Sequence, residues 1–300
     1  MSWLEVRVCA EMSAGESSAA VAVDILSARL TSCGAISVTL EAADDEEVLE
    51  PPPQTTPLWT RTVLTGLFPL DADVAAIRGA FAPDVEVTVA FLGDRNWLDQ
   101  WRAHAVNLQF GDRLWVLPRN VSPVLQGKLN TFSGAVLRLD PGLAFGSGSH
   151  PSTGLCLEWL ANAELNQRSV LDYGCGSGVL AVAAVLLGAG MTVAVDHDPQ
   201  ALVATRDNAN YNGATLSRVG LPDALDGHTQ FAVVVANILA DPLIELAPRL
   251  TKWLEPNGHL VLAGVLVSQG DAVMAAYPDI DFGEPAETEG WLCLAGCFSG

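Results

Sequence analysis

Hydrophobic and polar positions along the chain predict two regions that differ in their order of secondary structure. In residues 1–92, alternating and helically spaced segments follow one another as strand, helix, strand, strand, helix and strand. The predicted strands are Trp3–Val8, Ala35–Leu40, Trp59–Leu67 and Val85–Phe91, and the predicted helices are Glu16–Leu30 and Asp71–Phe81. This order matches a ferredoxin-like split unit, so we predict a small α+β domain with a role in binding.

From Pro151 onward, predicted helices and strands alternate. The strands are Val170–Leu171, Thr192–Val195, Phe231–Ala236 and His259–Ala263, and the helices are Pro151–Leu165, Val179–Leu187, Pro199–Tyr211 and Pro242–Leu254. Such alternation predicts an α/β domain with a mostly parallel sheet that helices cover on both faces. The tail, Trp291–Phe298, has the pattern of a last, antiparallel strand.

The segment between these regions predicts a connection followed by two short strands. Residues 94–104 have the spacing of an amphipathic helix, and Arg113–Leu117 and Ala135–Leu139 alternate as strands. We therefore predict a first domain over residues 1–92, a linker helix over 93–108 and a second domain over 109–300.

A glycine-rich turn lies between the first strand and the next helix of the second domain. The segment Asp172-Tyr173-Gly174-Cys175-Gly176-Ser177-Gly178 follows an apolar run, and the next strand ends at Asp196. Glycines let backbone N–H groups approach a ligand closely. A carboxylate at the neighbouring strand end can accept hydrogen bonds from a ribose diol. The sequence therefore predicts a nucleotide-type cofactor at this turn.

The spacing of the glycines indicates which cofactor this is. A dinucleotide fingerprint needs a third glycine at position 179, where this chain has Val179, and no Lys-Ser or Lys-Thr pair follows as in a P-loop. The arrangement D-x-G-x-G-x-G, from Asp172 to Gly178, resembles motif I of the class I methyltransferases, which use S-adenosylmethionine. This resemblance implies a Rossmann-like fold for the second domain, with Asp172, Gly174 and Gly176 at the cofactor.

Two further segments are expected at the same edge of the sheet, because ligands bind at the carboxyl ends of parallel strands. Asn237 begins the segment Asn237-Ile238-Leu239-Ala240 after a predicted strand, where amine-directed methyltransferases carry an Asn-Pro-Pro-Tyr-like motif. The second segment, 143–153, is rich in glycine and small residues and contains His150 and Thr153 just before the first helix. Such a loop can wrap closely over a ligand.

Four runs of the chain carry a more specific likeness: LDPGLAFGSGSHPSTGLCLEWL, VLDYGCGSGVLAVAAVLLGA, DHDPQALVATRDNANYNG and VVVANILADPLIELAPRL. Together they resemble one family, the PrmA family of bacterial ribosomal-protein methyltransferases. The resemblance covers the chain from about Asp94 to the C-terminus. In residues 1–92 only the order of elements and the acidity agree with it. Ser147, Ser149 and Ser152 stand where the family usually has threonines, so a hydroxyl is kept at each position.

The resemblance implies a protein N-methyltransferase. By this likeness Thr153, Gly174, Asp196 and Asn237 contact S-adenosylmethionine, and the N-terminal domain holds a basic protein of the large ribosomal subunit. The implied acceptors are the substrate's N-terminal α-amine and its lysine ε-amines.

Individual roles leave alternatives open. Asn237 either orients the substrate amine toward the methyl group or only contacts the cofactor or caps the following helix. His150 is a candidate proton acceptor, but a histidine before proline at a helix start can equally be structural. Asp172 can hold the glycine turn through backbone N–H groups or reach the amino group of the cofactor.

The charge of the chain narrows the choice of partner. The formal net charge is −20, with only two lysines, Lys128 and Lys252, so direct nucleic-acid binding is disfavoured. Residues 1–92 hold fourteen acidic residues and four arginines, which makes this third about twice as acidic per residue as the rest. Such a field steers a basic partner toward the first domain. The alternative is that the run 44–47 is simply a solvated acidic loop.

The cysteines and the apolar segments of the chain indicate the cellular compartment of the protein. Six cysteines without C-x-x-C spacing indicate reduced thiols and no metal site. Glu5 and Arg7 interrupt the first apolar stretch, so we expect no signal peptide. The apolar segment Val179–Val195 is broken by glycines and is shorter than the roughly 20 residues that a bilayer span requires. We therefore expect a cytoplasmic protein without membrane association. A monomer is a separate expectation that these observations do not bear on.

Two rival functions follow from the same residues. An enzyme of this class could methylate a lysine of another protein or a small molecule, although a small-molecule enzyme has no need of the acidic first domain. A non-enzymatic module with a degenerate nucleotide fold is the second rival. The complete set of glycines, carboxylates and asparagine argues against that module.

Overall fold

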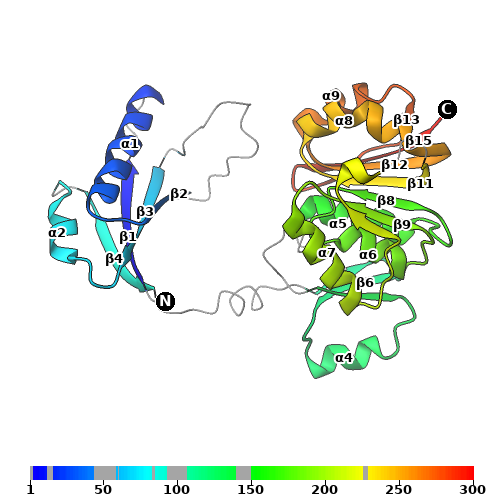
Figure 1. Ribbon diagram of the computed structural model, residues 1–300, viewed down its shortest axis with the longest axis horizontal. Helices are drawn as coiled ribbons and strands as arrows, with labels where there is room; N and C mark the ends of the chain where they lie inside the picture. Colours follow the sequence, from blue (N-terminus) through cyan, green and yellow to red (C-terminus); the bar gives the residue numbers. More distant parts are fainter. Residues whose placement is uncertain are drawn as a thin grey trace. The chain divides into compact units, whose positions relative to one another are not determined.

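The computed structural model describes residues 3–11, 16–43, 59, 61–82, 85–92, 107–139, 150–225 and 229–300. The chain divides into two compact units, residues 1–96 and 97–300 (Figure 1). The division falls within the predicted linker, most of which lies outside the described residues. The linker helix and the predicted domain limits therefore stay predictions.

The smaller unit is an α+β unit with four antiparallel strands in the order β2-β3-β1-β4. Its elements are β1 (Trp3–Glu11), α1 (Glu16–Ser32), β2 (Ser37–Ala42), β3 (Arg61–Pro69), α2 (Val74–Gly79) and β4 (Val87–Leu92). Alternate residues of β3 are buried, because Leu64 and Phe68 belong to the same core as Leu30 of α1. Element order and pairing agree with the predicted ferredoxin-like unit.

The larger unit is built on an eight-stranded sheet in the order β10-β9-β8-β11-β12-β15-β13, with β14 paired to β15. The strands are β8 (Val170–Tyr173), β9 (Thr192–Val195), β10 (Arg218–Gly220), β11 (Phe231–Asn237), β12 (Leu254–Leu266), β13 (Ile280–Phe282), β14 (Ala286–Thr288) and β15 (Trp291–Phe298). Neighbouring strands from β10 to β12 are parallel, whereas β15 runs antiparallel to β12. The predicted α/β class and the antiparallel last strand are confirmed.

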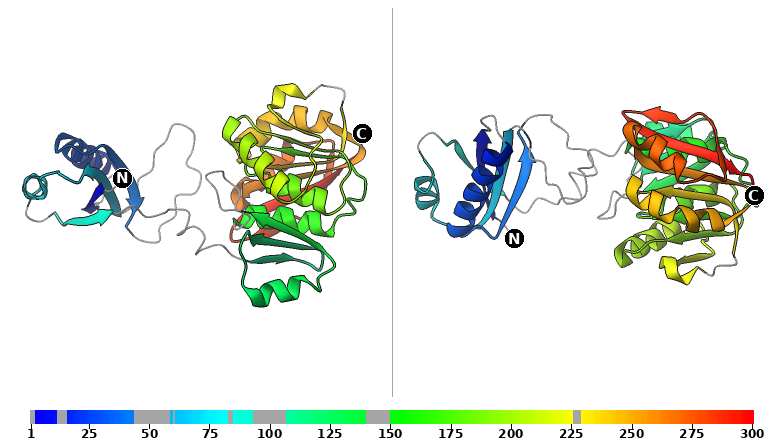
Figure 2. Two further views of the ribbon diagram at one scale, coloured as in Figure 1. Left: turned by 60° about the horizontal axis from the view of Figure 1, so that its bottom comes forward. Right: turned by 90° about the horizontal axis from the view of Figure 1, so that it is seen from above.

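Helices cover both faces of this sheet (Figure 2). One face carries α5 (Pro151–Asn162), α6 (Val179–Leu186) and α7 (Pro199–Tyr211), and the other carries α8 (Ala240–Lys252) and α9 (Gly270–Ala275). Val170 of β8 belongs to the core on the first face and Leu171 to the core on the second. Because both faces are covered, the central strands are apolar at consecutive positions.

A separate three-stranded sheet precedes α5 in the chain. It contains β5 (Leu108–Phe110), β6 (Leu114–Pro118) and β7 (Ala135–Leu139), with α4 (Pro123–Leu129) between β6 and β7. Leu137 and Leu139 of β7 are buried in the core that α5 and α6 share. The two predicted strands of this segment therefore exist, but they form their own small sheet.

The shortest elements did not stand out in the sequence pattern, and two helices are clearly shorter than predicted. The missed elements are β5, α4, β10, α9, β13 and β14, which have only three to seven residues each. Too few residues fall in such elements for a period to stand out. One of the two shortened helices is α5, which ends at Asn162 instead of Leu165. The other, predicted at Asp71–Phe81, spans only Val74–Gly79; it begins after Asp73, whose side chain accepts hydrogen bonds from Ala75 and Ala76 N–H and caps it.

In the part of the chain that the structure describes, no helix is both long and apolar enough to span a bilayer. No group of three or more His, Cys, Asp or Glu side chains is arranged there to hold a metal ion. The six cysteines are free thiols, and those of Cys156, Cys175 and Cys293 are buried.

Candidate active site at the carboxyl edge of the sheet

The glycine turn connects β8 to α6 at the carboxyl edge of the large sheet. Gly174, Gly176 and Gly178 have φ angles of 77°, 53° and 78°, which L residues with a Cβ rarely adopt. A Cβ at Gly174 would collide with the Ile238 side chain, and one at Gly178 would lie 2.8 Å from the Thr205 side chain. The turn is therefore pressed between neighbouring segments, and glycine is required by conformation and by space.

Asp196 lies at the end of β9 beside this turn, with 7% of its surface exposed. One carboxylate oxygen accepts a hydrogen bond from Gly176 N–H at 2.9 Å, and the other accepts one from Asp198 N–H at 2.9 Å. A carboxylate oxygen can accept more than one hydrogen bond, so both remain able to receive ribose hydroxyls. Asp196 lies at the strand end where the sequence predicted it. Through its bond to Gly176 it also fixes the conformation of the turn. Its ribose role stays a prediction.

Asp172 is buried below the turn. Its Oδ2 accepts a hydrogen bond from Ala181 N–H in the first turn of α6 at 3.0 Å, while Oδ1 has no hydrogen-bond partner among the described residues. Burial raises the pKa of Asp172 to about 7; the Ala181 hydrogen bond opposes this, and the negative charge of Asp196 adds to it.

The unpartnered oxygen of Asp172 tests whether the site fits the predicted cofactor. A buried acceptor without a donor is costly, and a nearby cation would favour the ionised carboxylate. The ammonium group of a methionine moiety supplies both a donor and a positive charge. The site therefore fits S-adenosylmethionine, and the backbone-holding role of Asp172 is met through α6 rather than through the glycines.

Asn237 and Thr153 come together from distant parts of the chain. Asn237 is the last residue of β11, and its Nδ2 donates a hydrogen bond to Thr153 Oγ1 in the first turn of α5 at 3.0 Å. Thr153 is only 3% exposed. The bond uses the donor end of the Asn237 amide, so Oδ1 is the end left to accept from a substrate amine. The two implied cofactor contacts thus lie side by side, and their roles stay predictions.

His150 caps α5. Its Nδ1 accepts a hydrogen bond from Ser152 N–H at 3.3 Å and lies 2.8 Å from Ser152 Oγ, and its ring packs edge-on against Trp291 with centroids 4.8 Å apart. Burial lowers the pKa of His150, and the negative charge of Glu289 opposes that shift. The geometry displays the structural role, and proton transfer by His150 stays a prediction. Residues 143–149 lie outside the described residues.

The segment after β10 borders the same edge. Gly220 O accepts a hydrogen bond from Asp196 N–H at 3.3 Å, and the 3-10 turn η1 (Pro222–Ala224) follows. Leu221 is 50% exposed, and Asp223 pairs with Arg249 of α8 at 3.1 Å. Leu221 follows Gly220, the backbone partner of Asp196, and its exposed apolar side chain suits the predicted position of an adenine ring, which stays a prediction.

Two buried polar residues of α7, which the sequence pattern did not reveal, hold the glycine turn through hydrogen bonds to its carbonyl groups. Thr205 Oγ1 donates a hydrogen bond to Gly176 O at 3.1 Å, and Asn208 Nδ2 donates one to Ser177 O at 2.9 Å. The available signal is their spacing, since residues three apart share a helix face and this face is otherwise apolar. Polar residues at such positions indicate buried hydrogen bonds.

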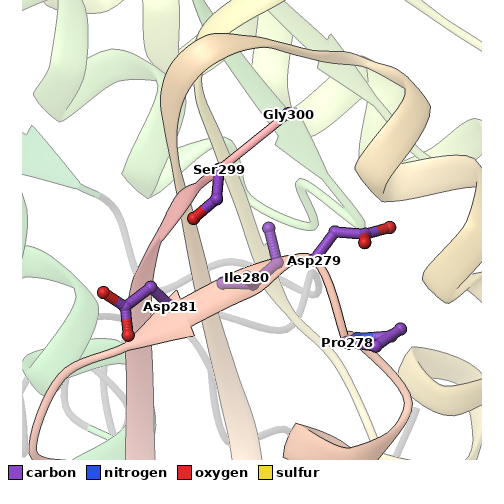
Figure 3. Close-up of a pocket in the computed structure, with 6 residues that line it drawn as sticks. All are labelled: Pro278, Asp279, Ile280, Asp281, Ser299 and Gly300. Carbon is purple, nitrogen blue, oxygen red and sulfur yellow. The ribbon is translucent and has the colours of Figure 1, made fainter.

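A cleft of about 430 Å³ lies at the opposite edge of the sheet (Figure 3). It is lined by Pro278, Asp279, Ile280, Asp281, Ser299 and Gly300. Because β15 is antiparallel to β12 and pairs Cys297 with His259, its end lies at the amino ends of the parallel strands. The cleft is therefore separate from the glycine turn, and none of the predicted site residues lines it.

Comparison with known proteins gives consistent matches along the chain. The family model described as "Ribosomal protein L11 methyltransferase (PrmA)" matches residues 2–298. The chain is 42% identical over 304 residues to the ribosomal protein L11 methyltransferase of Nitrosococcus oceani, covering 99% of both chains. It is 43% identical over 306 residues to that of Pseudomonas aeruginosa, covering 99% of this chain and 98% of the relative.

The chain also resembles solved structures, among them one from the same family of names. It is a ribosomal protein L11 methylase from Lactobacillus delbrueckii subsp. bulgaricus, with a TM-score of 0.57 and 29% identity. The match covers 65% of this chain and 99% of that one. The sequence matches also include residues 2–92, where motifs alone gave little support.

Proposed function

The chain belongs to the ribosomal protein L11 methyltransferase (PrmA) family, and from this membership we propose that it methylates ribosomal protein L11. The donor is S-adenosylmethionine. The proposed acceptors are lysine ε-amines and the N-terminal α-amine of that substrate. The observation that carries the proposal is the full-length match to relatives of this name at 42–43% identity.

The carboxyl edge offers a residue for each end of the donor. Asp196 would accept hydrogen bonds from the ribose diol, and Asp172 Oδ1 would accept one from the amino group. The bare turn at Gly174 and Gly176 would admit the ligand close to the backbone. When bound, S-adenosylmethionine would supply an electrophilic methyl group on a sulfonium, and the neutral thioether would leave as the methyl is transferred. Positioning then provides most of the catalysis.

The acceptor must be a neutral amine before it can attack. Deprotonating a lysine at neutral pH costs about 4 to 5 kcal/mol, whereas an α-amine costs only about 1 to 1.5 kcal/mol. Burial of the amine beside a positive charge favours loss of its proton. Modification of the α-amine is therefore less demanding than modification of a lysine, and the same site serves both.

We assign the orienting role to Asn237. With its Nδ2 bound to Thr153, Oδ1 is available to accept an N–H of the substrate amine, which turns the nitrogen lone pair toward the methyl carbon. His150 is the candidate proton acceptor. Because its Nδ1 accepts from Ser152 N–H in the cap of α5, Nδ1 carries the lone pair of the neutral ring and is the nitrogen that would take the proton. The lowered pKa of His150 favours the neutral imidazole that such a role needs.

The smaller, more acidic region is the proposed docking site for the substrate. A basic ribosomal protein is steered toward negative charge, which raises its rate of association at low salt. A ribosomal-protein substrate also supports a cytoplasmic location. We further propose a monomer that acts on the protein rather than on nucleic acid, in keeping with the shortage of lysines.

The experiment is transfer of tritiated methyl groups to purified ribosomal proteins, compared with a lysate freed of ribosomes. We expect label in the ribosomal fraction, on a protein that mass spectrometry identifies as L11. Acetylating its N-terminus should remove only the α-amine label and leave the lysine label. Label confined to the ribosome-free lysate would refute the ribosomal substrate and favour methylation of another protein or a small molecule.

A further inference from the structure

Helix α7 holds two consecutive carbonyl groups of the glycine turn. Thr205 is fully buried and Asn208 is 6% exposed, and their side chains donate to Gly176 O and Ser177 O. A peptide group is planar, so fixing a carbonyl also fixes the direction of the following N–H group. The conformation of the turn is therefore set from α7 as well as by its glycines.

The same helix holds a second segment through its C-terminal cap, Asn212. The Asn212 side chain accepts from Arg138 N–H at 2.7 Å and donates to Arg138 O at 2.8 Å, which is how a neighbouring strand would pair with β7. The same Nδ2 also donates to Asn208 O at 2.8 Å. The link between β7 and the turn thus has two steps: the Asn212 side chain joins Arg138 to the backbone carbonyl of Asn208, and the Asn208 side chain holds Ser177 O.

Strand β7 is in turn held to the rest of its small sheet. The Arg138 guanidinium donates to Arg119 O at 3.2 Å and to Gln126 Oε1 of α4 at 2.9 Å. The guanidinium of Arg119 lies over the ring of Tyr211, the last residue of α7, 4.1 Å from its centroid. After β7 the chain continues through residues 140–149 into α5, the helix that carries Thr153.

We propose that α7 is a brace in which Asn208 and Asn212 are positioning residues for S-adenosylmethionine. They hold the glycine turn in a fixed relation to β7, whose continuation leads to Thr153. Neither side chain need touch the cofactor. They act through Ser177 and Arg138, and the affinity for the cofactor depends on both.

A contribution to folding stability does not explain why asparagine occupies positions 208 and 212. Asparagine has a low helix propensity, and a buried amide costs free energy unless its hydrogen bonds are made. An apolar residue at position 208 would bury more favourably against the neighbouring core, but it could not hold Ser177 O. The polar choice therefore indicates that the orientation of the turn is what the residue provides.

The test measures the dissociation constant of S-adenosylhomocysteine by calorimetry on the full-length protein, with Asn208→Ala, Asn212→Ala and the double variant. Each single variant should weaken binding by about tenfold. Each residue provides one step of the same link, so either substitution breaks it. The double variant should therefore weaken binding by much less than the product of the single effects. Amide hydrogen exchange of the ligand-free protein should become faster at residues 176–178 in all three.

Tyr277→Phe is the matched control. It removes another buried side-chain hydrogen bond to a carbonyl, from Tyr277 Oη to Leu243 O at 2.7 Å, on the α8 face of the sheet. We expect it to lower the melting temperature and leave the dissociation constant unchanged. If the asparagine variants behave like this control, with affinity within twofold of the wild type, the brace is refuted.

Two more variants keep the proposal testable should Asn208→Ala not fold. Asn212→Asp retains the acceptor for Arg138 N–H and loses both donated bonds, so it should weaken binding nearly as much as Asn212→Ala. Thr205→Val keeps the shape but loses the bond to Gly176 O, whereas Thr205→Ser keeps the hydroxyl. Weakened binding in the valine variant and recovery in the serine variant are expected, and equal binding in both would contradict the proposal.

Discussion

The two units bury different kinds of side chain. Among the described residues, Thr62 is the buried polar residue of the smaller unit. Those of the larger unit are Ser152, Thr153, Asp172, Ser177, Thr192, Asp196, Thr205 and Asn208. Burying polar groups costs free energy unless they are hydrogen-bonded. Asp196, Thr205 and Asn208 hydrogen-bond to the backbone of the glycine turn, to which Ser177 belongs, and Asp172 precedes it. Buried polar groups thus gather at this turn, whereas the described core of the smaller unit is almost entirely apolar.

Replacing a glycine of the turn by alanine should cause the largest loss of stability. Gly178→Ala forces a Cβ to within 3.0 Å of Thr205 Cα at a φ of 78°, and we expect a loss of about 3 kcal/mol in the free energy of unfolding. Gly290→Ala is the control, because φ is 80° there but no atom lies within 4 Å of the added Cβ. Urea denaturation should give about 1 to 2 kcal/mol for the control. Equal losses would mean that the close packing of the turn is unimportant.

Removing the carboxylate beside the turn should come next. Asp196→Ala should weaken S-adenosylmethionine binding by about 1.5 to 3 kcal/mol, because a charge-assisted hydrogen bond to the ribose is lost and Gly176 loses its acceptor. Asp198→Ala removes only the cap on Gln200 N–H and should leave binding unchanged. Calorimetry on both variants checks this. Comparable weakening in the two would contradict the assigned role of Asp196.

Asn237→Ala should act on turnover. We expect kcat to fall 10- to 100-fold, about 1.4 to 2.7 kcal/mol in the barrier, because the amine is no longer oriented. Thr153→Ser keeps the hydroxyl that binds Asn237 Nδ2 and should retain most of the activity. Methyl transfer and cofactor affinity are measured for each variant. Unchanged turnover together with unchanged affinity would remove Asn237 from both roles.

Asp172 should make the stability of the larger unit depend on pH. Its pKa is raised from 3.8 to about 7 in the folded protein, so ionisation opposes folding. Without cofactor, this contribution is absent below about pH 4, grows as the pH rises, and is complete above about pH 7. Asp172→Asn should remove this contribution, so its stability relative to the wild type should be greater at pH 7.5 than at pH 4.5, by about 2 to 3 kcal/mol. A pH-independent difference between the two proteins would show that the carboxylate is not perturbed.

The smallest effect is expected in the smaller unit. Arg7 and Glu41 pair at 3.2 Å, but their side chains are 46% and 53% exposed. Such a pair contributes little because water screens it, so Arg7→Ala should change the free energy of unfolding by less than about 0.5 kcal/mol. Chemical denaturation measures the change. A loss of more than about 1 kcal/mol in the free energy of unfolding would contradict the view that polar groups stabilise the smaller unit little.

The features that could be predicted from the sequence are those formed by residues close together in the chain. The hydrogen bonds between residues far apart in the chain could not be predicted. The glycine turn and Asp196 were identifiable because strand, turn and strand end follow each other closely in the chain. The bonds from Thr205 and Asn208 to the turn span 29 and 31 positions, and the Asn237–Thr153 bond spans 84. Family resemblance implied that Asn237 and Thr153 share a ligand, but their direct contact is visible only in the folded chain.

The most direct test of the account is a crystal structure of the full-length protein with S-adenosylhomocysteine. We predict ligand density against Gly174, with the ribose on the Asp196 carboxylate and the amino group next to Asp172 Oδ1. Density in the cleft at Ser299, or an empty edge beside Gly174 under saturating ligand, would contradict it.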